Sequence, residues 1–299
     1  LMSLIMESGL WPCFRQRPID VVADPTKEPK GIYVSSFDSS PLAPDYEFIL
    51  GDRMEQVQIG LKALNVLCQG KVHLSSRKSS PFAAMHEVNH HVVEGVHPAG
   101  NIGTQIHHID PINKGEFVWG INIQDVAAIG KLFESGQVDG KKCIALTGSD
   151  VKSPCYYNVY TGSSVGDLVD KKVSGDNVRY ISGNVLTGDQ KSLDDYIGFY
   201  HNQVTVIPEG NEYKFFLTTG WLGLGFDKFS NSRLFPTFLS KHKKYALDTN
   251  TNGEERAFVV TGELEKVFPF DILPMHLTKA AITNDIDGME NLGIYEVAP

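Results

Sequence analysis

The sequence of 299 residues lacks several features that would each assign it to a class of protein. No apolar run approaches the ~20 residues that a membrane-spanning helix needs, so we expect a water-soluble chain. The formal net charge of −9 supplies no surplus of cationic side chains, and phosphate recognition depends on a concentrated positive surface. Nucleic-acid binding is therefore not expected. Neither a G-x-S-x-G elbow nor a Walker loop is present, so nucleophilic and phosphoryl-transfer chemistry have no support.

Cysteine is also scarce. The four cysteines, Cys13, Cys68, Cys143 and Cys155, are scattered and show no C-x-x-C spacing. In a chain of this size they indicate reduced intracellular thiols rather than disulfides or metal ligands. We therefore expect neither thiol-redox chemistry nor an iron–sulfur cluster within these residues.

The composition is that of an ordinary globular protein, with 41% apolar and 10% aromatic residues. A chain of this length exceeds one ordinary hydrophobic core, so two domains are the default expectation. The chain opens at Leu1 within a helical pattern and closes after an apparent strand at residues 292–297. We therefore expect a fragment of a longer protein.

Strands and helices alternate through the first half of the chain. A helix with one apolar face from Met54 to Cys68 follows the capping pair Asp52 and Glu55. A second helix begins after Asn122 and ends at Gly136. The predicted strands lie at residues 31–34, 71–74, 92–96 and 143–146. This alternation indicates βαβ units with a parallel sheet, so we assign residues 1–152 to one α/β domain.

The pattern changes to short strands after Asp150. Ser164, with Asp167 three residues on, predicts one short helix. The predicted strands lie at residues 156–160, 178–181, 185–186 and 204–207. One helix against several short strands indicates a small α+β domain of β-grasp type, which we place at residues 153–228.

The remaining residues, 229–299, form a partial C-terminal region that we expect to pack on domains absent from this sequence. It has a predicted strand at 257–261 and a predicted helix at 273–281.

The stretch from Val96 to Phe133 is the main candidate for a binding site. It begins as a polar loop broken by glycine and proline and continues into the helix after Asn122. Such a loop presents free N–H groups and a favourable helix dipole to an anion. The alternative is a structured loop whose histidines are satisfied by the protein itself.

Two arginines complete this hypothesis. Arg15 and Arg17 follow a helix end and could clamp a phosphate or carboxylate, or pair with acidic neighbours. The candidate ligand-binding set is Arg15, Arg17, Asp38, His97, Gly100, Gly103, His107 and Asp110, where Asp38 lies in the turn-rich segment SSFDSSPLAPD. No residue is assigned a catalytic role.

A competing motif lies at His86, Glu87 and His90, which match the zincin pattern H-E-x-x-H. That chemistry needs a helix, so that both imidazoles reach one zinc ion and the glutamate serves as base. Pro81 upstream, the valines within the segment and Gly95 favour a strand instead. We therefore keep a zinc-dependent hydrolase only as an alternative and expect no metal.

Several segments together resemble a known family. They are ESGLW followed by FRQRP, VHPAGNIGTQIHHIDP, the helix W-x-x-N-x-Q-D-V-A-A-I-G-K-L-F, ISGNVLTG, ERAFVVTG and PFDILP. In this order, over nearly the whole chain, they are similar to the NqrA subunit of the Na+-translocating NADH:quinone oxidoreductase.

The resemblance implies a peripheral subunit on the cytoplasmic face of the bacterial inner membrane. The complex passes electrons from NADH to quinone and exports Na+, so the rest of the complex supplies the implied partners and quinone is a candidate ligand. The middle of this subunit resembles the flavin-bearing subunit of respiratory complex I, with a nucleotide-binding-like α/β domain followed by a soluble-ligand-binding β-grasp domain. Family members add an N-terminal barrel-like domain and a C-terminal helical domain.

The sequence departs from the complex I relative where that protein binds flavin phosphate. A glycine-rich loop follows the SGL turn there, whereas here Ser8-Gly9-Leu10 is followed by Trp11-Pro12-Cys13-Phe14. Bulky side chains would prevent close approach of backbone to phosphate. We therefore expect a scaffold or quinone-associated subunit without its own flavin. A nucleotide- or flavin-binding electron-transfer module, built on residues 97–103 and Arg15, is the alternative.

Overall fold

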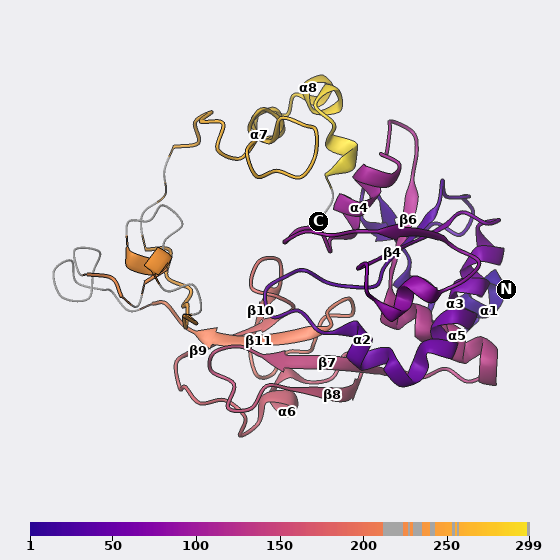
Figure 1. Cartoon of the computed structure of the whole chain (residues 1–299), viewed down its shortest axis with the longest axis horizontal. Coiled ribbons are helices and arrows are strands. Elements are labelled where there is room, and N and C mark those ends of the chain that lie inside the picture. The colour runs from indigo at the N-terminus through magenta and orange to yellow at the C-terminus, as the bar shows by residue number, and fades with distance from the viewer. Residues whose placement is uncertain are drawn as a thin grey trace. The chain divides into compact units, whose positions relative to one another are not determined.

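The chain forms two compact units in a computed structural model (Figure 1). Unit 1 contains Leu1–Cys143 and Ala257–Pro299, and unit 2 contains Ile144–Arg256. The structure describes residues 1–211, 224–226, 228–229, 235–239, 243–252, 255 and 257–297. Among these residues, no helix combines the length and the apolar character that a bilayer crossing requires. The predicted domain boundaries at 152 and 228 remain predictions, and residues 212–223, just before the second of them, lie outside the described residues.

Unit 1 is built on a six-stranded sheet in the order β2-β1-β6-β3-β4-β5. Strands β3, β4, β5 and β6 are mutually parallel, whereas β1 runs antiparallel to both β2 and β6. The predicted parallel sheet is therefore confirmed. The strands are β1 (Arg15–Arg17), β2 (Val21–Val22), β3 (Ile32–Ser35), β4 (Val72–Ser76), β5 (Asn89–Val92) and β6 (Val118–Asn122).

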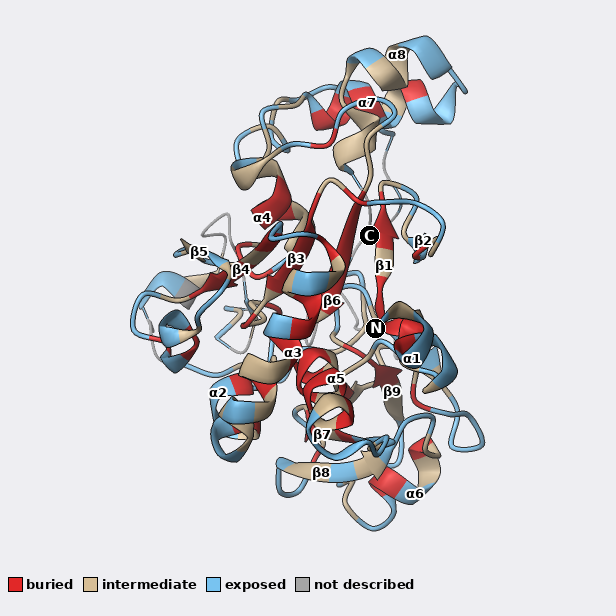
Figure 2. Cartoon of the chain, turned by 90° about the vertical axis from the view of Figure 1, so that its right-hand side faces the viewer, coloured by how far each residue is buried: buried red, intermediate tan, exposed pale blue. Residues whose placement is uncertain are grey.

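Helices cover both faces of this sheet, because its central strands carry apolar side chains on both sides. On one face, α3 (Met54–Leu67) and α5 (Ile123–Ser135) bury Ile32, Val34 and Trp119 in the largest core. On the other face, α4 (Ile102–Ile109) packs over Tyr33 and Val118. Figure 2 shows the resulting buried band along β3, β4 and β6. The shorter helices before α4 are α1 (Met2–Glu7), η1 (Trp11–Cys13), α2 (Tyr46–Leu50), η2 (Gly51–Arg53) and η3 (Pro81–Ala84).

Helices α3 and α5 approach each other through glycines. A Cβ on Gly130 of α5 would lie 1.8 Å from the carbonyl oxygen of Gln56 on α3. A Cβ on Gly60 of α3 would lie 2.1 Å from the carbonyl oxygen of Val126 on α5. Glycine is costly inside a helix, so its presence at both positions reflects the close packing of the two backbones.

The start and end of α5 confirm the sequence prediction. The Asn122 side chain accepts a hydrogen bond from the Gln124 N–H, and Gly136 ends the helix in the left-handed conformation at φ 70°. The predicted cap of α3 was wrong. Asp52 lies in η2, and Arg53 precedes α3 without a side-chain cap, because a separate helix α2 capped by Asp45 comes first.

The stretch from Val96 to Phe133 contains two elements that periodicity did not reveal. Strand β6 lies at the centre of the sheet, and α4 carries His107 and His108, which the sequence analysis placed in a loop. The predicted strand at 92–96 begins earlier, as β5 at Asn89. The apparent strand at 292–297 is instead a helical turn, η5 (Ile294–Glu296). Each of these segments is too short for its period to separate helix from strand.

Unit 2 contains a five-stranded sheet in the order β10-β9-β11-β7-β8. Strand β7, predicted to extend the first sheet, pairs instead with β11 in parallel, so that prediction was wrong. The predictions at 156–160, 178–181 and 204–207 are confirmed, whereas residues 185–186 lie in a turn before β10. The elements are β7 (Lys141–Thr147), β8 (Cys155–Tyr160), α6 (Val165–Val169), β9 (Val178–Ser182), β10 (Asp189–Lys191), β11 (Gln203–Pro208) and η4 (Pro236–Leu239).

The last described residues belong to unit 1 and form α7 (Pro274–Ile282) and α8 (Ile286–Asn291). The helix predicted at 273–281 is confirmed as α7. The strand predicted at 257–261 was wrong, since those residues are irregular.

Replacing Gly130 by alanine should lower the free energy of unfolding by roughly 1–3 kcal/mol, because the new methyl group meets backbone rather than a movable side chain. Urea denaturation of the purified chain measures the change. Gly51→Ala is the matched control. Gly51 has helical backbone angles and an added Cβ meets nothing within 4 Å, so that variant should unfold at nearly the same urea concentration. Equal midpoints for the two variants would contradict the proposed close packing of α3 and α5.

Candidate functional site

The carboxyl edge of the parallel strands is the place where an α/β sheet of this kind binds ligands. From β3 the chain reaches β4 on one side through α2 and α3, and β6 on the other side of β3 follows α4. The strand order therefore reverses between β3 and β6. Ser35 ends β3 and Asn122 ends β6 at this point, where a crevice between diverging connections is expected.

The loop of residues 93–101 packs against the segment that leaves β3. The Gly100 N–H donates to Ser39 Oγ at 2.8 Å, and the Ser35 hydroxyl donates to the Gly100 carbonyl oxygen at 3.3 Å. A Cβ on Gly100 would lie 2.4 Å from the Ser39 nitrogen, so only glycine allows this approach. The protein's own backbone thus occupies space beside the end of β3.

Gln105, on the first turn of α4, fixes the loop from below. Its amide nitrogen donates to Ser35 Oγ at 2.9 Å and to the Ala99 carbonyl oxygen at 3.1 Å. Gln105 is 2% exposed, so both hydrogen bonds are shielded from water. A buried side chain that bridges strand and loop in this way holds both in one arrangement.

Three candidate residues from the sequence analysis meet in this place. His97 lies with its Nδ1 3.1 Å from Ser39 Oγ, and Gly100 contacts the same serine. The Asp38 carboxylate accepts from the Ser40 N–H at 2.8 Å, which shapes the turn that presents Ser39. These groups hydrogen-bond one another, so the arrangement corresponds to the partnered loop that the sequence analysis left as an alternative.

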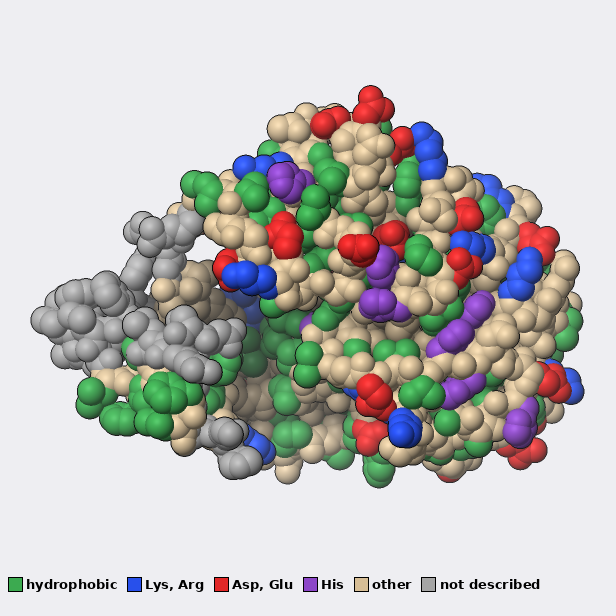
Figure 3. All heavy atoms as spheres, turned by 45° about the horizontal axis from the view of Figure 1, so that its top comes forward, with side chains coloured by type: hydrophobic (Ala, Val, Ile, Leu, Met, Phe, Trp, Pro, Cys, Tyr) green, Lys and Arg blue, Asp and Glu red, His purple; other side chains and the backbone are tan. Residues whose placement is uncertain are grey.

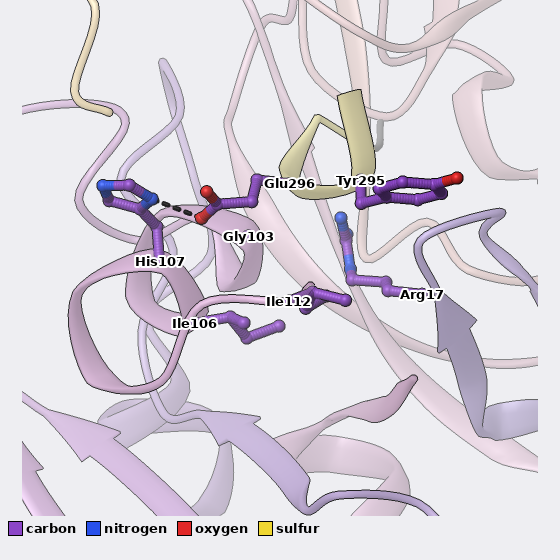
Figure 4. Close-up of a pocket in the computed structure, with 7 residues that line it drawn as sticks. All are labelled: Arg17, Gly103, Ile106, His107, Ile112, Tyr295 and Glu296. Atoms are coloured by element: carbon purple, nitrogen blue, oxygen red, sulfur yellow. Dashed lines mark hydrogen bonds and ion pairs between the residues drawn. The ribbon is translucent and has the colours of Figure 1, made fainter. Parts of the chain in front are cut away.

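Another part of the candidate set lines a small cleft beside α4 (Figure 4). The cleft encloses about 220 Å³, including space open to solvent. This is below the size at which small-molecule sites usually begin, about 300 Å³. Its lining residues are Arg17, Gly103, Ile106, His107, Ile112, Tyr295 and Glu296.

His107 holds the C-terminal segment of unit 1 against α4. Its Nδ1 is hydrogen-bonded to the Glu296 carboxylate, and its Nε2 accepts from the Asp271 N–H at 3.3 Å. Its ring stacks on Phe270 with centroids 4.8 Å apart. Because Nε2 acts as acceptor, Nδ1 carries the proton that Glu296 receives. His107 therefore has a structural role in which both ring nitrogens are engaged.

The two arginines do not form a joint clamp. Arg15 forms a two-pronged pair with Asp20, whose carboxylate oxygens lie 3.2 and 2.6 Å from its Nε and Nη2. Arg17 is 8% exposed and lies beside Gly103, where a Cβ would come within 3.3 Å of its Nη1. Burial lowers the pKa of Arg17, and Arg15 lowers it further, while Asp20 acts in the opposite direction.

Asp110 lies apart from both places. Its carboxylate binds the Lys30 ammonium at 2.7 Å, and Glu116 binds the same ammonium at 2.9 Å. Hydrogen bonds from Asn113 and from Lys30 hold the pKa of Glu116 at about 2, so it stays ionised as a partner of Lys30. The candidate set therefore divides among four local structures rather than one pocket.

The zincin alternative is wrong on geometry. Glu87 lies in a bend with φ 61°, and His90 lies on strand β5, so the segment has no helical turn that could place two imidazoles on one zinc ion. Among the described residues no group of three or more histidine, cysteine, aspartate or glutamate side chains is arranged to hold a metal ion.

The sequence analysis missed the residues that organise these places. Ser35, Ser39 and Gln105 pin the loop, and Glu296 binds His107 from 189 residues away. Only the serine-rich SSFDSS segment gave a signal, as a run typical of turns. A long-range partner such as Glu296 leaves no local pattern.

The geometry so far defines an α/β protein with a parallel sheet and a second, smaller α+β unit. Residues 1–138 match the family model described as the NqrA second alpha/beta domain, and residues 143–192 match the one described as the NQRA C-terminal domain. The relatives share this assignment. The NqrA subunit of the Na+-translocating NADH-quinone reductase of Rhodopirellula baltica is 39% identical over 301 residues, which cover 99% of this chain and 65% of that relative.

The corresponding subunit of a Marinomonas strain is 38% identical over 98% of this chain and 65% of the relative, and that of Vibrio atlanticus is 36% identical over 98% and 66%. The chain therefore belongs to the NqrA family, the family of this subunit of the Na+-translocating NADH-quinone reductases. It spans about 65% of the length of the relatives that it matches.

Among solved structures, an NAD+-reducing [NiFe]-hydrogenase in the H2-reduced state aligns with a TM-score of 0.48 and 14% identity. The alignment covers 69% of this chain and 46% of that chain.

Replacing Ser39 by alanine removes the acceptor for the Gly100 N–H and the contact with His97. We expect the loop of residues 93–101 to open more readily by about 1 kcal/mol, a several-fold increase in the opening equilibrium. Amide hydrogen exchange at Gly100 measures this opening. Ser135→Ala, on the exposed end of α5, is the control and should leave exchange at Gly100 unchanged. Unaltered exchange in the Ser39 variant would show that this contact does not hold the loop.

Proposed function

We propose that this chain is part of a peripheral subunit of a Na+-translocating NADH-quinone reductase. It acts there as a scaffold or quinone-associated subunit, without a flavin of its own. The relatives that it matches carry that name over 98–99% of this chain. The observation that favours a scaffold is the crevice between β3 and β6, where Ser39, Gly100 and Gln105 bond to one another.

A cofactor at this edge would need backbone N–H groups directed at its phosphates. The N–H of Gly100 is instead committed to Ser39 Oγ. A ligand would have to displace the loop and break the buried bonds of Gln105, which lowers affinity by the free energy of that opening. The α4 cleft is a poor alternative because it is small and bounded by the pair of His107 and Glu296.

The loop after α1 gives a second reason to propose the absence of flavin. Gly9 supplies the turn at φ 77°, but Trp11 and Phe14 follow and are buried. The Trp11 ring packs against Trp119 with centroids 5.4 Å apart, and its indole N–H donates to the Ala23 carbonyl oxygen at 2.8 Å. Aromatic side chains therefore fill the region where a glycine-rich loop would leave space.

For unit 2 we propose a β-grasp fold of the soluble-ligand-binding type. Its sheet has β7 and β11 parallel and adjacent at the centre, with antiparallel strands outside them and one helix, α6, packed on Leu146 and Val206. For unit 1 we propose kinship with the flavin subunit of complex I. We also propose that the subunit lies on the cytoplasmic face of the bacterial inner membrane and binds the other members of the complex there.

The first test is binding by the purified chain. We expect a colourless protein without flavin absorbance that gives no saturable signal when titrated with NADH by calorimetry. A short-chain soluble ubiquinone should bind weakly or not at all to a pure scaffold, and saturably to a quinone-associated subunit. Flavin that copurifies in stoichiometric amount, or saturable NADH binding, would overturn the proposal of a cofactor-free subunit.

The second test addresses the partners. Membranes from cells that make the complex without its NqrA subunit should retain the added chain, and membranes from cells lacking the whole complex are the control. Equal retention by both membranes would contradict a role within this complex.

A further inference from the structure

Two histidines on neighbouring strands of unit 1 share a hydrogen bond. His73 lies on β4 and His91 on β5, and the His73 Nδ1 lies 3.0 Å from the His91 Nε2. The two rings are nearly parallel, with an interplanar angle of 15°. Tyr33 on β3 stacks on the other side of His73, with ring centroids 4.6 Å apart. The three side chains thus cross three parallel strands on the face that α4 covers.

This pair can hold little positive charge. A neutral imidazole has one N–H donor and one acceptor nitrogen, so a hydrogen bond between two rings needs at least one of them neutral. A first added proton leaves that bond in place but puts a charge in a half-buried position. A second proton turns both facing nitrogens into donors, and the bond is lost.

The surroundings also oppose protonation. Burial lowers the pKa of His73 below its ordinary value of 6.5, and the neighbouring His91 lowers it further. Burial and the nearby His90 lower the pKa of His91 in the same way. Tyr33 remains uncharged, because burial and Asp110 raise its pKa to about 12.

The charged groups that face the pair from outside these strands are few. Asp110, which follows α4, raises the pKa of His73, but it is the smallest of the three influences. The Asp110 carboxylate is bound by Lys30 at 2.7 Å, and Lys30 is shared with Glu116. The balance therefore favours the neutral pair.

Strand β5 depends on this pair because it is an edge strand. It lies at one end of the sheet order and pairs with β4 alone. His90, on the opposite face, adds a contact of its Nε2 with Ser76 Oγ at 2.7 Å. The chain continues directly from β5 into the loop of residues 93–101, which starts with a hydrogen bond from the Val93 N–H to the Ser76 carbonyl oxygen at 2.9 Å.

We propose that His73 and His91 form a proton-sensitive latch that holds β5, and through it the loop of residues 93–101, over the carboxyl edge of the sheet. Opening of β5 exposes both rings to water, where they bind protons at ordinary affinity. The open state therefore takes up protons that the closed state refuses. The latch is complete above pH 6.5 and weakens as the pH falls through that value toward the lower pKa of the closed state.

The latch is accessible to solvent protons. His73 and His91 are both partly exposed, and Figure 3 shows histidine side chains in a row at the surface of the molecule. Acidification would uncover the crevice between β3 and β6, so the inference adds a condition under which the filled site opens. It stands independently of any role in a reductase complex.

Hydrogen exchange between about pH 7.5 and about pH 5.5 tests the proposal. After correction for intrinsic exchange rates, the opening equilibrium of β5 and of residues 93–101 should rise below pH 6.5. The rise is at most about tenfold per pH unit for each proton taken up. The slope should flatten in His73→Gln and in His91→Gln and vanish in the double variant. His276→Gln is the control, because this exposed histidine of α7 should leave the slope unchanged.

An NMR titration of the histidine rings in the unaltered chain keeps the test decisive if a variant fails to fold. We expect His73 and His91 to titrate below pH 6.5 and the exposed His276 near its ordinary value. Ordinary titration of His73 and His91, or an exchange slope that is the same in the double variant as in the unaltered chain, would overturn the latch.

Discussion

The close approach of Gly100 to Ser39 is the constraint on which the ligand-binding edge of unit 1 depends. A parallel sheet with helices on both faces leaves a crevice where its connections diverge, and its fate depends on what the chain places there. Here the loop after β5 places backbone against the end of β3, with Gln105 bonded beneath it. The absence of a side chain on Gly100 permits a contact that any other residue would prevent.

Polar side chains near this edge are mostly satisfied by one another. Arg15 binds Asp20, Asp110 binds Lys30, and His107 is engaged at both nitrogens by the C-terminal segment. A binding site usually keeps some polar groups available to a ligand, whereas these groups stabilise the protein. The same fold can therefore serve as a scaffold, because function lies in the site rather than in the architecture.

Local signals in the sequence predicted a substantial part of the fold. The Asn122 cap, the Gly136 stop and the alternation of strand and helix all rest on residues close together in the chain. Predictions failed where short segments carried no clear period, as for β6 and α4, or where a strand joined a different sheet, as for β7. The pairing partner of a strand depends on contacts remote in sequence, and no window of residues contains them.

The sequence by itself determined the family, the α/β character of the first unit and the absence of a glycine-rich loop at Trp11. The tertiary structure alone decided how the candidate residues are used. It brought His97 to Ser39 and Glu296 to His107, and it placed His73 beside His91 by the register of β4 and β5. These contacts arise because packing, not local preference, selects which side chains meet, and it selects them across tens to hundreds of residues.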